Sequence, residues 1–114
     1  MRKVRCLGVA AVALVLAAVG VARASGPSFD CHKAKQWSDM MVCGNPNLAD
    51  LDAKVDKAYR KAQQPLPEKD AKQVREVQRA WRKGREKCQQ DPDPMKCLHT
   101  YYERRIKEIV QPEG

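Results

Sequence analysis

An apolar run near the amino terminus indicates the compartment in which the rest of the chain folds. Residues 6–22 are apolar or glycine without interruption, a basic start (residues 1–5) precedes them, and the motif A-R-A follows at 22–24. This order of a basic start, an apolar run and an A-x-A motif is typical of a secretory signal peptide. We therefore expect residues 1–24 to be cleaved and the mature chain to begin at Ser25, in the periplasm or outside the cell.

Two alternative interpretations of this segment are a permanent membrane anchor and a lipid attachment site. Cleavage is favoured over an anchor because the run has only 17 residues and ends in the cleavage motif. Lipid attachment needs a cysteine directly after a small-residue stretch, whereas Cys6 precedes the apolar run and Cys31 follows Ser28, Phe29 and Asp30. We expect no stable membrane insertion after cleavage.

The mature chain is too small and too polar to form a large core. Residues 25–114 comprise 90 residues with 18 basic and 14 acidic side chains, a formal charge of +4, and about a third of them are hydrophobic. A domain of this size buries roughly 60% of its surface, and covalent crosslinks often supplement its core. We expect one domain over residues 25–114. Its length excludes nucleotide-binding folds, barrels and multi-domain enzymes.

Four cysteines remain after cleavage, namely Cys31, Cys43, Cys88 and Cys97. An even number in an oxidising compartment indicates disulfides, of which three connectivities are possible. We favour the two local pairs, 31 with 43 and 88 with 97, because residues 89–96 form a turn between two helical patterns. A zinc site is less favoured because neither spacing matches C-x2-4-C. No metal and no cofactor are expected.

Apolar spacing predicts three main helices. Asn45-Pro46 is a helix start, and Pro65-Leu66-Pro67 ends the helix, which gives residues 46–64. Apolar residues at three- and four-residue spacing then predict helices over 68–89 and 94–110. The fold class is all-α, a small disulfide-stapled bundle whose short N-terminal segment is pinned by a disulfide. Residues 38–42 could add one helical turn.

The residues of an enzyme active site are missing from the mature sequence. The only histidines are His32 and His99, both interpreted as surface or packing residues. A serine nucleophile needs a positioned base, and the three serines all precede the bundle. The thiols are expected to be oxidised. We therefore predict that the protein is not an enzyme.

Two polar residues lie close to Trp81 on the apolar face of the helix predicted at 68–89. They are Gln78 and Arg85, and a polar side chain on a buried face needs partners. Asp52 and Tyr59 occupy the corresponding flank of the first helix. We predict a structural polar cluster of these four, in which Arg85 contacts a carboxylate or carbonyl where the first two helices meet. The alternative is that Arg85 is presented to a ligand.

The opposite face of the same helix is strongly basic. Residues 60–88 carry ten basic and four acidic side chains. A solvated face with ion pairs four residues apart is the simplest interpretation. A functional alternative is binding of an anionic wall or outer-membrane polymer, and its candidate residues are Lys72, Arg75, Arg79 and Lys83. Nucleic acid is not expected, because the protein is exported and lacks interleaved aromatic residues.

The order of the motifs is similar to that of a known family. The first half contains Phe29-Asp30-Cys31, Val42-Cys43 and N-P-x-L-x-x-L-D over 45–52, and the second contains Q-R-A-W-x-x-x-R-x-x-C over 78–88 and Cys97-Leu98. Together they resemble the LprI-type lysozyme inhibitor family. The resemblance implies an exported, disulfide-bonded helical domain, and the name-giving member inhibits lysozyme. Gly84 lies within the helix predicted at 68–89 and lowers the stability of that helix by about 1 kcal/mol relative to alanine.

Vertebrate-type lysozymes are strongly basic, so an inhibitor with a charge of +4 needs a local acidic surface to bind them. We hypothesise that the first helix and the turn Asp91-Pro92-Asp93 supply it. The candidate partner-binding residues are Asp50, Asp52, Asp56 and Asp91.

Overall fold

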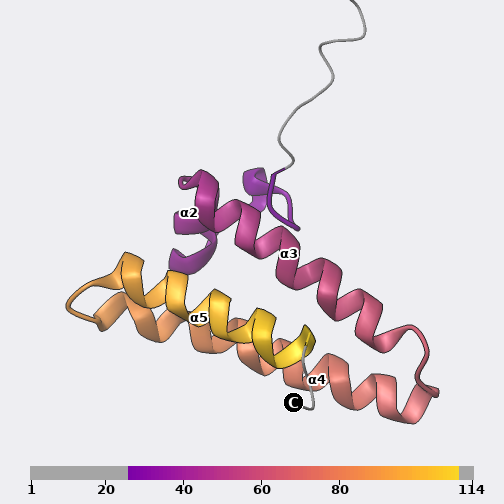
Figure 1. Ribbon diagram of the computed structural model, residues 1–114. Coiled ribbons are helices and arrows are strands. Elements are labelled where there is room, and N and C mark those ends of the chain that lie inside the picture. The colour runs from indigo at the N-terminus through magenta and orange to yellow at the C-terminus, as the bar shows by residue number, and fades with distance from the viewer. Residues whose placement is uncertain (1–25, 111–114) are drawn as a thin grey trace, which may run out of the picture.

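The computed structural model describes residues 26–110, which form a helical bundle (Figure 1). A 3-10 helix, η2 (Cys31–Lys33), and a short helix, α2 (Trp37–Cys43), precede three long helices. These are α3 (Pro46–Gln63), α4 (Glu68–Gly84) and α5 (Pro94–Val110), and the 3-10 helix η3 (Arg85–Gln90) extends α4. The predicted all-α class is confirmed. The predicted signal peptide lies outside the described residues.

The starts of α3 and α5 are set by residues that cap them. The Asn45 side chain accepts hydrogen bonds from the backbone N–H groups of Asn47 at 3.0 Å and Leu48 at 3.1 Å. Asp93 likewise accepts from the N–H of Lys96 at 3.2 Å. In both cases the residue after the cap is proline, which favours the first turn of a helix. Both predicted starts are therefore confirmed.

The second long helix ends earlier than the predicted 68–89, because the α-helical geometry stops at Gly84. A β-carbon on Gly84 would lie 2.1 Å from the hydroxyl oxygen of Tyr101 on α5. The glycine therefore leaves room for the Tyr101 side chain against α4. The chain continues as η3, in which residues three apart share one face. This geometry turns Arg85 and Cys88 inward together, and both are buried.

The three long helices run in alternating directions, and α4 and α5 form a hairpin (Figure 1). α3 packs along α5, and α2 covers the first part of α3 and η3. Between α4 and α5 lie large side chains, among them Trp81 and Tyr102, whose rings meet edge to face with centroids 5.0 Å apart. The buried apolar core comprises Val42, Leu48, Val55, Cys88, Leu98 and Tyr102.

The structure contains both of the favoured disulfides. Cys31–Cys43 ties the N-terminal segment to the end of α2, and Cys88–Cys97 closes the turn between η3 and α5. This outcome confirms the two local pairs over the crossed arrangements. Among the described residues there is no group of three or more histidine, cysteine or acidic side chains arranged to hold a metal ion. None of the described helices is long and apolar enough to cross a membrane.

Candidate functional site

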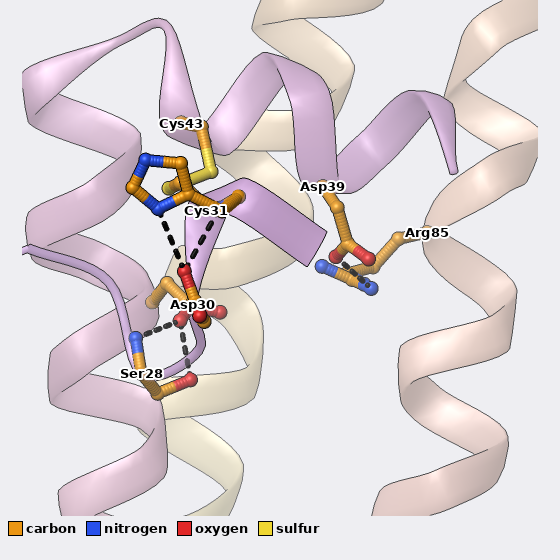
Figure 2. Close-up of a disulfide and its surroundings, with 8 residues drawn as sticks. Ser28, Asp30, Cys31, Asp39, Cys43 and Arg85 are labelled. Carbon is orange, nitrogen blue, oxygen red and sulfur yellow. Dashed lines mark hydrogen bonds and ion pairs between the residues drawn. A yellow bond between two sulfur atoms is a disulfide. The ribbon is translucent and has the colours of Figure 1, made fainter. Parts of the chain in front are cut away.

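A buried polar network lies at the end of the bundle that carries both disulfides. Its centre is Arg85, whose side chain is only 2% exposed. The guanidinium donates to the carbonyl of Arg82 at 2.9 Å, to the hydroxyl of Tyr102 at 2.9 Å and to Asp39 Oδ1 at 3.0 Å. Figure 2 shows this side chain reaching across to Asp39 on α2. Each nitrogen of the buried cation therefore has a partner, as burial of a charge requires.

Tyr102 connects this cation to a buried carboxylate. Its hydroxyl donates to Asp52 Oδ1 at 2.7 Å and accepts from Arg85. Asp52 Oδ2 accepts from the backbone N–H of Ser28 at 2.8 Å and from the Ser28 hydroxyl at 2.5 Å. The network thus joins α2, α3, η3 and α5 to the segment that precedes η2, and the place of Ser28 below the first disulfide is visible in Figure 2.

Charge and burial shift the pKa values of the network in consistent directions. Burial raises the pKa of Tyr102 well above its usual value, and the neighbouring Asp52 adds to this effect. For Arg85, burial alone lowers the pKa, but Tyr102 and Asp39 outweigh that effect and raise it. The tyrosine therefore stays neutral and the arginine stays charged at physiological pH, which preserves the hydrogen bonds that each makes.

A second contact ties α2 to η3 beside the network. The backbone N–H of Ser38 donates to Glu86 Oε1 at 3.2 Å, and the Ser38 hydroxyl donates to Glu86 Oε2. Two adjacent residues of α2, Ser38 and Asp39, are thus bonded to two adjacent residues of η3, Glu86 and Arg85. Paired contacts of this kind fix the orientation of α2 as well as its position.

The predicted cluster of Asp52, Tyr59, Gln78 and Arg85 is divided in the structure. Arg85 and Asp52 meet through Tyr102, and the carboxylate on Arg85 comes from α2 rather than from the seam of α3 and α4. Gln78 is buried, but its Oε1 accepts from Arg105 of α5 at 3.0 and 2.8 Å.

Tyr59, the fourth member, is half-buried and lines a hollow with Arg75 and Arg79 at the α3–α4 seam. Asp39, Tyr102 and Arg105 are not among the residues predicted from the sequence. Tyr102 lies four residues after Leu98 in the helix predicted over 94–110, on the same face. A buried tyrosine hydroxyl needs a hydrogen-bond partner, and this requirement was the signal that could have identified Tyr102.

The four acidic residues proposed for partner contact have different surroundings. Asp52 is 1% exposed and fully engaged, so it cannot contact a partner, and this part of the prediction is wrong. Asp50 lies 3.8 Å from Lys54, and Asp56 is bonded to Arg60 at 2.8 Å. Their charges are therefore partly neutralised by lysine and arginine on the same helix.

Asp91 is exposed in the turn between η3 and α5, and its Oδ1 accepts the backbone N–H of Asp93 at 2.8 Å. Asp93 is also exposed, and its side chain caps α5. Neither carboxylate has an ion-pair partner among residues 26–110. The turn is closed by the Cys88–Cys97 disulfide and lies at one end of the bundle (Figure 1), where it carries two exposed carboxylates.

The four basic residues proposed for anion binding lie on α4. Lys72, Arg79 and Lys83 are exposed, whereas Arg75 is partly buried and bonded to Glu68 at 2.7 Å. That hydrogen bond raises the pKa of Arg75. The strip is therefore a solvated face with one internal ion pair and three exposed cations.

Comparison with known proteins assigns the chain to a family. Residues 31–109 match the family described as "Lysozyme inhibitor LprI". The proteins named lipoprotein LprI in Mycobacterium bovis and in two strains of Mycobacterium tuberculosis are 30% identical to this chain over 113 residues.

These matches cover 93% of this chain and 56% of each relative, so the chain spans about half the length of the curated relatives it matches. No solved structure matches the chain. The family match includes both disulfides and four of the five residues of the polar network, all except Ser28. The chain therefore belongs to the LprI family of lysozyme inhibitors.

Proposed function

We propose that the protein is an exported inhibitor of a cell-wall-degrading muramidase and that it acts by protein–protein contact rather than by catalysis. The observation that carries this proposal is the family match over residues 31–109, which spans α2, α3, α4 and all of α5 except Val110. The two disulfides suit a protein in an oxidising compartment, periplasmic or extracellular.

The buried network has a structural role in this proposal. Arg85, Tyr102 and Asp52 are buried and bonded to one another and to partly buried Asp39 and Ser28, so they hold the helices in place instead of meeting a substrate. A rigid scaffold lowers the conformational entropy lost on binding, because less of the surface has to be ordered.

The contact surface that fits a basic lysozyme is the turn Asp91-Pro92-Asp93, which we call the acidic turn. It is exposed, carries two carboxylates and is braced by a disulfide. Opposite charges across an interface mainly raise the association rate and the specificity. Asp50 is a secondary candidate, because Lys54 partly neutralises it.

The test is inhibition of lysozyme-catalysed cell-wall lysis by the oxidised protein, at two salt concentrations and against basic and less basic lysozymes. Stoichiometric inhibition supports the proposal, and no inhibition of any lysozyme class contradicts it. The Asp91→Lys variant should weaken inhibition of a basic lysozyme about tenfold. Glu103→Lys is the matched control, because Glu103 is exposed on α5 and the charge change is the same. Equal effects of the two substitutions would exclude the acidic turn as the contact.

A second candidate function is binding of an anionic envelope polymer through α4. It is favoured by the three exposed cations, Lys72, Arg79 and Lys83, which have no ion-pair partner among residues 26–110. Binding of this kind weakens steeply with added salt. Charge reversal at Arg79 and Lys83 should abolish polymer binding and leave lysozyme inhibition unchanged, which distinguishes the two candidates.

A further inference from the structure

The end of the bundle remote from the disulfides has an apolar groove between α3 and α5. Its volume is about 460 Å³, and its apolar wall includes Ile106, Ile109 and Val110 of α5. Val110 is 57% exposed, and the two isoleucines are only partly buried. A groove of this volume is within the range of small-molecule binding sites, which are mostly apolar with a few polar groups.

All the charged residues on the other wall of the groove are lysines. Lys54, Lys57 and Lys61 of α3 line it, and their spacing of three and four residues places them on one face of the helix. Lys54 lies near Asp50 at 3.8 Å, while Lys57 and Lys61 have no ion-pair partner within residues 26–110. No acidic residue lines this groove among the described residues.

A neighbouring hollow provides an internal comparison. It has a volume of about 470 Å³ and shares Ala62 and Ile109 with the groove, but its polar lining mixes Arg105 with Asp70 and Glu108. Both hollows offer apolar surface, and only the α3–α5 groove combines it with unopposed cations. The combination of apolar surface with unpaired positive charge therefore distinguishes this groove from the neighbouring hollow.

We propose that the groove between α3 and α5 binds the acyl chain of an anionic amphiphile, with the negatively charged headgroup at Lys57 and Lys61. The aliphatic chain removes the exposed side chains of α5 from water, and long lysine side chains can pack their methylene groups along it while the ammonium groups meet the headgroup. This binding site is separate from the acidic turn and does not depend on lysozyme inhibition.

The probe is dodecyl phosphate below its micelle concentration, titrated into the oxidised full-length protein after export with its own leader. Binding is measured by calorimetry and by NMR shifts of the backbone amides. We expect binding with the largest shifts at Ala58, Ile106 and Ile109. Butyl phosphate, which lacks the long chain, and dodecyltrimethylammonium, which reverses the headgroup charge, should each bind at least about tenfold more weakly.

Two variants test the two walls of the groove. Lys57→Glu/Lys61→Glu should weaken dodecyl phosphate binding about tenfold or more at low salt. Lys33→Glu/Lys35→Glu is the matched control, because both lysines are exposed near η2 and the change in net charge is the same. Ala62→Trp, at an exposed position, fills the groove without removing a core side chain and should also abolish binding.

Several results would overturn the proposal. They are no binding of dodecyl phosphate, equal losses in the two lysine double variants, and equal binding of the cationic amphiphile. Sedimentation that shows a dimer dissociated by Ala62→Trp would mean that a second copy covers the groove. Contacts between residues 111–114 and Ile109 in the free protein would mean that the chain's own end fills it.

Discussion

The disulfide-bearing end of the bundle and the end formed by the α3–α4 connection differ in what lies between their helices. At the first, buried aliphatic residues surround a hydrogen-bonded network of Arg85, Tyr102 and Asp52. At the second, Val77 and Val110 are 50% and 57% exposed and two hollows of about 460 and 470 Å³ open at the surface, whereas the exposed large apolar residue of the first end is Met40, at 47%. A domain of this size has too few apolar residues to fill both ends.

This difference indicates a division of roles along the helices. We expect the disulfide end to contribute most of the stability and to hold the acidic turn in place, whereas the other end leaves apolar side chains exposed. The predictions below test whether stability is concentrated in this way.

Replacement of Arg85 by methionine should have the largest effect. It leaves the Asp39 carboxylate and the Tyr102 hydroxyl without the buried cation that bonds to both, and breaking a buried pair typically costs about 3 to 5 kcal/mol. Urea unfolding measures the loss. Arg79→Met, at an exposed position of α4, is the control and should cost less than about 0.5 kcal/mol. Similar losses in the two variants would contradict a central structural role for Arg85.

Removal of the Cys88–Cys97 disulfide by a double alanine substitution should cost roughly 3 kcal/mol, because the loop it closes gains freedom in the unfolded chain. The urea midpoint of this variant is compared with that of the oxidised wild type. The acidic turn should also lose its fixed geometry, so lysozyme inhibition should fall more than it does after removal of Cys31–Cys43.

Tyr102→Phe should cost about 1 to 3 kcal/mol, because Asp52 and Arg85 each lose a buried partner. It should also change the response to alkali. Burial raises the pKa of Tyr102 above its unfolded value of about 10, so the folded state holds the proton more tightly. The stability of the wild type should therefore fall as pH rises above about 10, by about 1.4 kcal/mol per pH unit.

The measurement is the free energy of unfolding between pH 9 and 11. Tyr102→Phe should show a shallower decline over this range. If Tyr102→Phe had the wild-type slope, the decline would have to come from another group.

Gly84→Ala should destabilise the protein by about 1 to 2 kcal/mol, although alanine is the better helix former. The added methyl group would meet the Tyr101 hydroxyl, which donates to the carbonyl of Trp81 at 3.2 Å. Thermal unfolding of the single variant and of Gly84→Ala/Tyr101→Phe measures the effect, and the second substitution should recover part of the loss. A stabilising Gly84→Ala would show that the Tyr101 side chain can move aside without cost.

The smallest effect is expected at the open end. Val77→Ala should cost less than about 0.5 kcal/mol, because Val77 is half exposed. Val55→Ala, the same change at a buried position of α3, should cost roughly 2 kcal/mol. Equal costs measured in urea would remove the distinction between the two ends.

Much of the fold could be predicted from the sequence because its signals are local. Asn45-Pro46 and Asp93-Pro94 define helix starts, and the short spacings between cysteines favour local disulfides. The polar network could be predicted only in part. The helical spacing placed Arg85 on the inner face, but its partner Asp39 is 46 residues away on α2, a helix with no clear apolar period.

The candidate contact residues show the same limit. A count of charges along α3 groups Asp50, Asp52 and Asp56, yet Asp50 is exposed, Asp52 is buried and Asp56 is partly buried. Burial of Asp52 depends on Ser28 and Tyr102, which come from distant segments. The local sequence pattern therefore predicts secondary-structure elements well. It predicts poorly which distant residues contact one another in the fold.

Native-state hydrogen exchange compares the two ends most directly. The amides of α2, the first half of α3, η3 and the first half of α5 should exchange only through global unfolding. Amides near Tyr59 to Gln63, Ala71 to Val77 and Ile106 to Val110 should exchange faster, through local opening with a lower free energy. Equal protection at both ends, or stronger protection at the α3–α4 end, would contradict the account.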